Sequence, residues 1–354
     1  MIDISPKLRR LVDALRPALG LSSAEAAAQP DIELARFAAR RHRVAPLLYR
    51  AWFPDPVLAT GEAGEFLKRR QLRNCAAVLR QKAVAEEFRE ALSARGIPHA
   101  EIKGRTLGEE LYGEAALRQA KDVDLLIGEG RMGDALNLAA RLGYRERHGK
   151  SPLRPRRARA ILKFHREVGV RHPRLPVEVE LHSRLLNHPH PDWRDVPTSS
   201  SRPGHKLTID DPDYVLYIIV HGALTGWKRL KWLCDLAMLA RSVKPRVRAQ
   251  VAAGAREFDC LPALQASLQA VGELWGEDLI ASWLDETGLP EDHVEIVRHL
   301  TVFGRRIGEE QRPLLHRRIM RHAGIIRDPA VFGTHPPTAR TAVDGALFWF
   351  LNKV

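Results

Sequence analysis

Hydrophobic periodicity changes twice along this chain, and these changes set its fold class. Residues 1 to about 95 place apolar side chains at helical spacing, and helical spacing returns from Asp211 onward. Between these regions lie short runs that alternate as strands do, at 99–103, 123–127, 161–170 and 176–182. The chain is therefore expected to be a helix-rich α+β protein in which helical regions flank a small α/β core.

Three regions follow from this pattern. We expect an N-terminal helical region at 1–60, a core at 61–205 and a C-terminal helical domain at 206–354. Short helices are predicted inside the core at 105–111 and 131–142, and Pro-, Arg- and Ser-rich stretches there are interpreted as loops. The C-terminal helices are predicted at 212–221, 228–241, 246–257, 262–275 and 291–307.

The longest predicted helix runs from about residue 65 to residue 94. Its apolar residues recur with a period near 3.6, which predicts one buried stripe made of Leu72, Cys75, Ala76, Leu79, Ala83, Phe88 and Leu92. Gly96 and Pro98 end this helix and introduce the first strand.

The chain carries a surplus of positive charge, with 56 lysines and arginines against 43 aspartates and glutamates, a net charge of +13. Such a surplus favours anionic partners such as triphosphate or nucleic acid, although an arginine-rich genome also contributes to it. No run approaches the roughly 18 apolar residues of a membrane helix, and the N-terminal segment lacks a signal-peptide core. We expect a cytoplasmic chain without membrane contact, with structural cysteines at positions 75, 234 and 260.

Two aspartates lie on one predicted strand. Asp122 and Asp124 are two residues apart, so they project from the same face while Val123 projects from the other. Neighbouring carboxylates repel one another unless a cation lies between them, and Mg²⁺ prefers oxygen ligands. The pair alone also fits a solvated edge strand, so the interpretation depends on its surroundings.

Three surrounding features favour a metal and phosphate site. The turn Lys103-Gly104 ends a strand and opens a helix whose backbone N–H groups can hold phosphate. Arg118, just upstream of the aspartates, can make charge-assisted contacts to phosphate. The later strand offers a third carboxylate, either Glu178 or Glu180, and alternation does not separate them because they share a face.

These residues also resemble a known family. The runs IPHAEIKGRTLGEELYGEAALRQAKDVDLLIG, VEVELH and HGALTGWKRLKWLCDLAMLA are similar to the uncharacterised nucleotidyltransferases of the polymerase-β-like superfamily, over roughly residues 30 to 245. Lys103 and Gly104 match the family's KG position, and Arg118 matches its arginine. Its metal pair falls on Asp122 and Asp124, and its last element on Glu180-Leu181-His182.

The resemblance implies a small mixed sheet backed by helices, two Mg²⁺ ions and an NTP substrate, with ATP expected. Asp122, Asp124 and Glu180 would hold the metals, and Glu180 would also orient or deprotonate the acceptor hydroxyl. The phosphate turn departs from better-known members, since Arg105 and Thr106 stand where a serine is usual. Thr106 is expected to supply the hydroxyl and Arg105 a charge.

Residues further along the chain have a structural and a functional interpretation. His182 is expected to point to the face opposite Glu180 and to pack or cap the strand. Lys231 and Asp235 are four apart, which fits an ordinary surface ion pair. The functional alternative is that His221, with Lys228 or Lys231, reaches across the cleft to the nucleotide.

Several other groups are interpreted as structural or solvated. Trp227 and Trp232 are expected in the core, and His188 and His190 are rejected as metal ligands. The basic runs 154–159 and 305–321 are read as solvated surface, since the first carries no aromatic residues for base stacking.

The sequence thus predicts a Mg²⁺-dependent nucleotidyltransferase that moves a nucleoside monophosphate from an NTP to an acceptor. The acceptor is left open between a protein or peptide side chain, a small-molecule hydroxyl and an RNA end such as tRNA. The alternative is a basic nucleic-acid- or protein-binding module with an inactive transferase core, whose binding would weaken steeply with salt.

Overall fold

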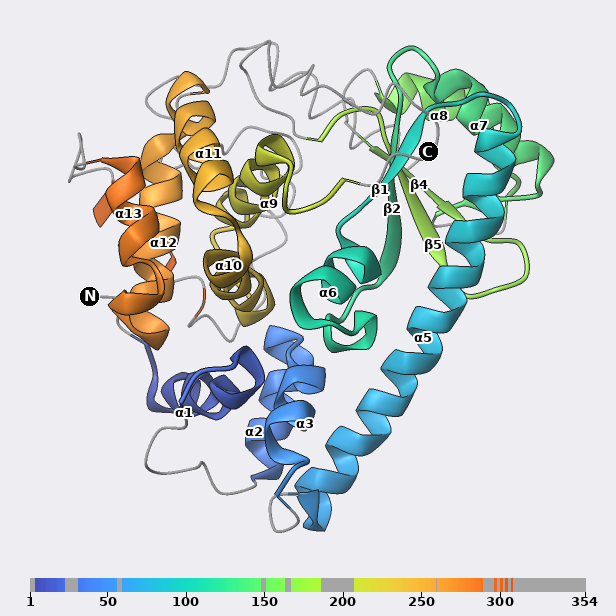
Figure 1. The fold of residues 1–354 in the computed structure, drawn as a ribbon. Helices are drawn as coiled ribbons and strands as arrows, with labels where there is room; N and C mark the ends of the chain where they lie inside the picture. The colour runs from blue at the N-terminus through green and yellow to red at the C-terminus, as the bar shows by residue number, and fades with distance from the viewer. Residues whose placement is uncertain are drawn as a thin grey trace.

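The fold is helix-rich α+β, as the periodicity predicts (Figure 1). The computed structural model of the chain describes residues 4–22, 31–55, 59–147, 151–162, 167–185, 207–258 and 260–288, with seven further positions between 296 and 307. Its helices are α1 (Pro6–Leu15), α2 (Ile32–Phe37), α3 (Ala45–Trp52), α5 (Gly61–Ser93), α6 (Gly104–Tyr112), α7 (Met132–Arg141), α8 (Pro155–Leu162), α9 (Pro212–Leu224), α10 (Leu230–Ser242), α11 (Pro245–Glu257), α12 (Leu261–Trp275) and α13 (Ala281–Thr287). No helix among these residues is long and apolar enough to cross a bilayer.

A five-stranded mixed sheet forms the centre of the site. The strands are ordered β1 (His99–Ile102), β2 (Asp122–Ile127), β5 (Glu178–His182), β4 (Glu167–Arg171) and β3 (Arg145–Glu146). The pair β2 and β5 is parallel, and every other pair is antiparallel. The two strands that carry the predicted carboxylates are therefore direct neighbours.

Two hydrophobic clusters lie on the two faces of β2. Val123, Leu125 and Ile127 enter a cluster formed with α7, α8 and the C-terminal half of α5. Leu126 enters a larger cluster shared by α6, the N-terminal helices and the helices after residue 207. The alternation of β2 therefore directs Asp122 and Asp124 toward the same face as Leu126, the face of the larger cluster.

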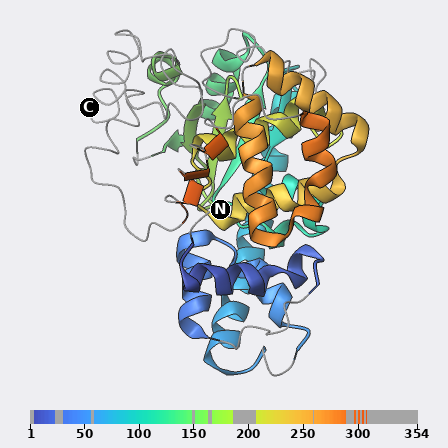
Figure 2. The same ribbon diagram turned by 90° about the vertical axis from the view of Figure 1, so that its left-hand side faces the viewer.

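The N-terminal helices pack against the C-terminal ones, and they lie below them in both views (Figures 1 and 2). The larger cluster thus joins side chains from before residue 60 and after residue 206 in one core. The three-part division at 60 and 205 stays a prediction, and a continuous core now connects its first and third parts.

The predicted stripe of α5 is wrong in its middle. Leu72 and Leu79 are 62% and 67% exposed, whereas the buried face carries the polar residues Asn74 and Gln81. The reason is that this part of α5 packs on the connection leading into β2, which presents backbone carbonyls. The side-chain amides of Asn74 and Gln81 donate to the carbonyls of Ala116 and Ala120, at 2.5 and 3.4 Å.

The segment before β4 also differs from its prediction. Within the described residues, the strand expected at 161–170 is Glu167–Arg171, and residues 161 and 162 belong instead to helix α8 (Pro155–Leu162). Pro155 opens α8, a position at which proline loses no helical hydrogen bond. The three cysteines are free, as expected.

Candidate active site

Four carboxylates form a grid on one face of the sheet. The parallel register of β2 and β5 places Asp122 beside Glu178 and Asp124 beside Glu180. Asp124 and Glu180 are buried, and Asp122 and Glu178 are half-buried. The structure therefore places Asp124 beside Glu180, while Asp122 lies on the same face beside Glu178 and outside the closest ligand group.

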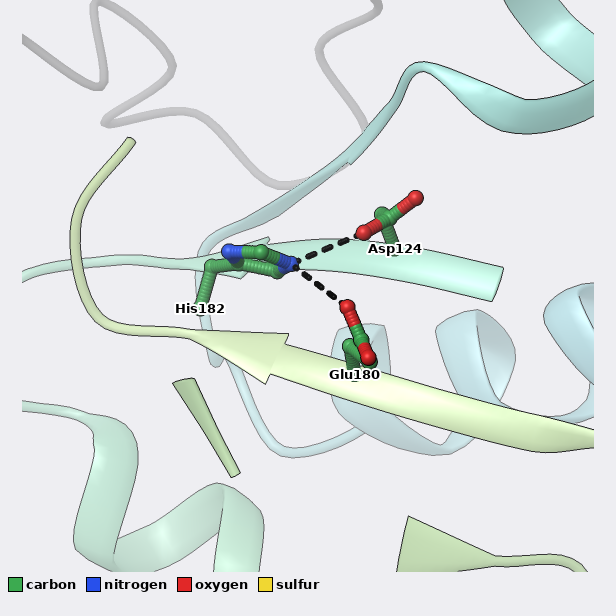
Figure 3. A group of neighbouring side chains, drawn as sticks. All are labelled: Asp124, Glu180 and His182. Carbon is green, nitrogen blue, oxygen red and sulfur yellow. Dashed lines mark hydrogen bonds and ion pairs between the residues drawn. The ribbon is translucent and has the colours of Figure 1, made fainter. Parts of the chain in front are cut away.

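His182 joins this group, and the prediction that it points to the opposite face is wrong. Residues two apart on a strand share a face, so His182 lies on the same side as Glu180 (Figure 3). Its Nε2 is 2.9 Å from Oδ1 of Asp124 and 3.8 Å from Oε2 of Glu180. One ligand atom from each of these three residues lies within 4.8 Å of the others, a donor set that fits one divalent cation.

The charge state of Asp124 is set by its two contacts. Burial on its own would raise the pKa of Asp124, but the ammonium of Lys103, 3.2 Å from Oδ1, and the imidazole of His182 outweigh burial and lower it. Both contacts are made to the same oxygen, Oδ1. Asp124 is therefore ionised at neutral pH.

The pKa values of Asp122 and Glu180 are shifted in the opposite direction. Burial, followed by the charge of Asp124, raises the pKa of Asp122. Burial, followed by the charges of Glu167, Asp124 and Asp122, raises the pKa of Glu180 to about 8. A cluster of this kind gains most from a bound cation, because the cation relieves both the repulsion and the lost hydration.

Arg147 is a member of the site that the sequence did not indicate. Its guanidinium lies 2.7 Å from Glu180 and 3.3 Å from Glu178, so it bridges the two glutamates of β5. Gly169 on β4 pairs with Glu180 on β5, and a Cβ at Gly169 would come within 2.6 Å of Cδ of Arg147. A glycine inside a strand is the one sequence signal for such a close approach.

The predicted phosphate turn opens α6 with a strained residue. Lys103 has φ 56° and ψ −143°, a backbone conformation that residues other than glycine rarely adopt, and Gly104 follows with φ 55°. The Lys103 N–H donates to the hydroxyl of Tyr214 at 2.9 Å. The Thr106 hydroxyl donates to the Lys103 carbonyl, and Arg105 pairs with Glu101 at 2.7 Å, so both side chains brace the turn in this structure.

The strain at Lys103 leads to a testable expectation. Replacing Lys103 by glycine should give a protein about 1 kcal/mol more stable than the alanine variant, because glycine tolerates this backbone conformation. Both substitutions remove the ammonium, so their difference reports the backbone alone. Urea denaturation measures it, and equal stabilities would show that the turn carries no strain.

Arg118 lies in a buried network. Its Nε donates to Asp235 at 2.9 Å, and one of its terminal nitrogens donates to the Gly104 carbonyl at 3.1 Å. The hydroxyl of Tyr112 donates to the other oxygen of Asp235 at 2.9 Å. The predicted surface pair between Lys231 and Asp235 is therefore wrong. Both residues lie on the buried face of α10, and Asp235 pairs with Arg118 instead.

The remaining predicted contacts lie on α9, on α10 and between these helices. Lys231 is buried and donates to the Gln119 carbonyl at 3.0 Å. His221 is half-buried, with its ring 6.2 Å from that of Trp232, and the Lys228 carbonyl accepts from Arg41. Trp227 is in the core as predicted, whereas Trp232 is half-buried. His188, His190 and, apart from Ile307, run 305–321 lie outside the described residues.

Comparison with known families agrees with this geometry. The family model described as uncharacterised nucleotidyltransferase matches residues 29–276, which include the whole sheet and helices α2 to α12. No curated protein and no solved structure matches the chain. Since the match covers well over half of the sequence, the chain belongs to the uncharacterised nucleotidyltransferase family.

Proposed function

We propose that this protein is a metal-dependent nucleotidyltransferase that transfers a nucleoside monophosphate from an NTP to a hydroxyl acceptor. The observation that carries the proposal is the convergence of Asp124, Glu180 and His182, beside Asp122, on one face of the sheet. Family membership supports the reaction class, and the buried, mutually repelling carboxylates support a need for cations.

Asp122, Asp124 and Glu180 would hold the divalent metal, for which Mg²⁺ is the first choice because carboxylate oxygens dominate the donor set. Bound metal would supply charge neutralisation at the phosphate oxygens. His182 is placed to complete the donor set or to hold Asp124 in position, since its Nε2 contacts both carboxylates of the group.

The transfer itself requires few covalent steps from the protein. The acceptor oxygen bonds to the α-phosphorus while the bond from that phosphorus to the α,β-bridging oxygen breaks, and pyrophosphate leaves. Glu180, ionised once a cation has displaced its proton, would orient the acceptor hydroxyl or take its proton. Lys103 stays beside Asp124, and the Gly104 turn presents the first N–H groups of α6 to phosphate.

The position of the label in the NTP tests this proposal. The protein is incubated with Mg²⁺, a cell lysate and ATP labelled at the α- or the γ-phosphate, followed by the other NTPs. Transfer from α-labelled but not γ-labelled nucleotide is expected. Label arriving only from the γ position would make the protein a phosphotransferase, and salt-sensitive nucleic-acid binding without any transfer would support the inactive-core alternative.

Metal binding is expected to release protons near neutral pH. Because the pKa of Glu180 is raised to about 8, the metal-free carboxyl carries a proton below that pH, and a cation must displace it. Affinity for Mg²⁺ should therefore increase as the pH rises toward 8 and level off above it.

Calorimetry at pH 7 in two buffers of different ionisation enthalpy measures this release, which should be about one proton per protein. The Glu180→Gln variant provides the control, since it has no proton to lose at this position. Equal proton release by the variant and the parent would assign the effect to another group.

A further inference from the structure

A second group of charges lies near Asp122, whose charge acts on three of its four members. Arg43, Lys121, Arg229 and Lys231, here called the basic cluster, come from three separate segments of the chain. Arg43 ends the turn of helix between α2 and α3, Lys121 immediately precedes β2, and the other two begin α10. Only Lys231 was considered as a binding residue from the sequence.

Backbone and side-chain hydrogen bonds hold these three segments together. The N–H of Leu230 donates to Nδ1 of His42 at 3.2 Å, and Arg41 donates to the Lys228 carbonyl, which joins the segment of Arg43 to that of Arg229. Lys231 donates to the Gln119 carbonyl at 3.0 Å, which joins α10 to the residues before β2. The four cations are therefore gathered by the fold rather than by chance proximity of mobile side chains.

Two members of the cluster lie against the ring of Trp232. Cζ of Arg229 is 5.6 Å and Nζ of Lys231 is 5.9 Å from its centroid. Stacking of this kind restricts the motion of both cations and leaves their charge without a carboxylate partner. Within the ranges that the structure describes, none of the four basic side chains forms an ion pair with a carboxylate.

The cost of gathering these charges is visible in their pKa values. Burial, then the charge of Arg229, lowers the pKa of Arg43 to about 10, against the opposing effect of Asp122. Burial lowers the pKa of Lys231, and the charges of Arg118 and Arg43 lower it further. A fold that retains such repulsion gains from an anion placed between the charges.

The cluster lies at the end of the sheet where the phosphate turn begins. A Cβ on Gly104 would lie 3.7 Å from the carbonyl oxygen of Asp122, so the N-terminus of α6 and the first residue of β2 are adjacent. Arg147 also lies beside the carboxylates, but Glu178 and Glu180 already balance its charge. Uncompensated positive charge is thus available near Asp122.

We propose that the basic cluster binds the β- and γ-phosphates of the NTP, with Arg43, Lys121 and Arg229 as binding residues beside Lys231. This inference rests on the proposed function and adds the site for the leaving pyrophosphate. It orients the nucleotide across the carboxylates, with the polyphosphate at Asp122 and the acceptor at Glu180. Arg guanidinium groups suit this role because they bind phosphate through paired N–H donors.

Binding of inorganic tripolyphosphate without metal tests the inference separately from catalysis. Affinities of the full chain for tripolyphosphate, ATP and AMP are measured by calorimetry, together with those of Arg43→Gln, Arg229→Gln and Lys121→Gln. Each arginine variant should lose about tenfold in affinity for tripolyphosphate and ATP and keep its affinity for AMP. Lys121 is exposed, so its variant keeps the test valid if an arginine variant folds poorly.

Arg131→Gln is the matched control. It removes the same charge beyond the other end of β2, where Arg131 pairs with Asp134 and contacts the Gly96 carbonyl. The inference is overturned if the cluster variants keep their affinity for tripolyphosphate, or if they lose affinity for AMP to the same extent. It is also overturned if these variants weaken only the binding of a short RNA, because the cluster would then bind the acceptor. Transfer of α-label that persists in those cases would leave the proposed function standing.

Discussion

Replacing Asp124 by asparagine should reduce nucleotidyl transfer by on the order of 10³-fold or more, because it removes a charge on which both reacting phosphate and metal depend. Asp124 occupies the centre of the site. Lys103 and His182 both contact its Oδ1, Glu180 lies beside it on β5, and burial excludes water from around it. Asparagine keeps the volume and one acceptor oxygen, so the loss reports charge rather than packing.

The measurement is kcat/KM for transfer of α-label, with metal affinity followed by calorimetry on the same samples. Asp134→Asn is the matched control, since Asp134 is an exposed carboxylate on α7 that pairs with Arg131. The control should retain full activity. An Asp124→Asn protein that folds and keeps more than about a tenth of the parental rate would remove Asp124 from the chemistry.

Strand alternation accounts for the part of the site that could be predicted. Once 122–127 and 178–182 are identified as strands, a period of two places Asp122 with Asp124 and Glu178 with Glu180. The same rule places His182 on the face of Glu180, because the two residues are two apart on β5. The predicted opposite orientation of His182 does not follow from alternation. If the carboxylates of these two strands share a metal ion, the strands must be neighbours, and β2 and β5 are indeed paired.

Contacts between distant segments account for what could not be predicted. Arg147 reaches Glu180 from the far edge of the sheet, and Arg43 meets Arg229 through two helical segments almost two hundred residues apart in sequence. Nothing in the periodicity of one segment identifies its partner. Helix α5 illustrates the same limit, since Asn74 is buried only because a neighbouring connection presents a carbonyl to it.

The buried pair of Arg118 and Asp235 connects the site to the C-terminal helices. Arg118 reaches the Gly104 carbonyl in the phosphate turn, and Asp235 on α10 holds Arg118 and Tyr112 at once. Both charged groups are almost fully buried. The position of the turn thus depends on a helix more than a hundred residues away in sequence.

Asp235→Ala should therefore lower the free energy of unfolding by about 3–5 kcal/mol, because it leaves the Arg118 guanidinium buried without a counter-charge. Urea denaturation measures the loss, and Lys244→Ala, which removes one partner of the exposed pair with Asp210, should cost under about 1 kcal/mol. A loss as small as that of the control would show that solvent reaches Arg118.

The double variant Arg118→Met with Asp235→Leu separates stability from positioning. Replacing both charges by apolar side chains should recover most of the lost stability, as buried ion pairs are often replaceable in this way. Transfer activity should remain low in the double variant, because the Gly104 carbonyl still lacks its donor and the turn at the start of α6 is no longer held against α10. Full recovery of both stability and activity would limit the pair to a structural role, and the phosphate turn would then be held by its other contacts, those of Lys103, Arg105 and Thr106.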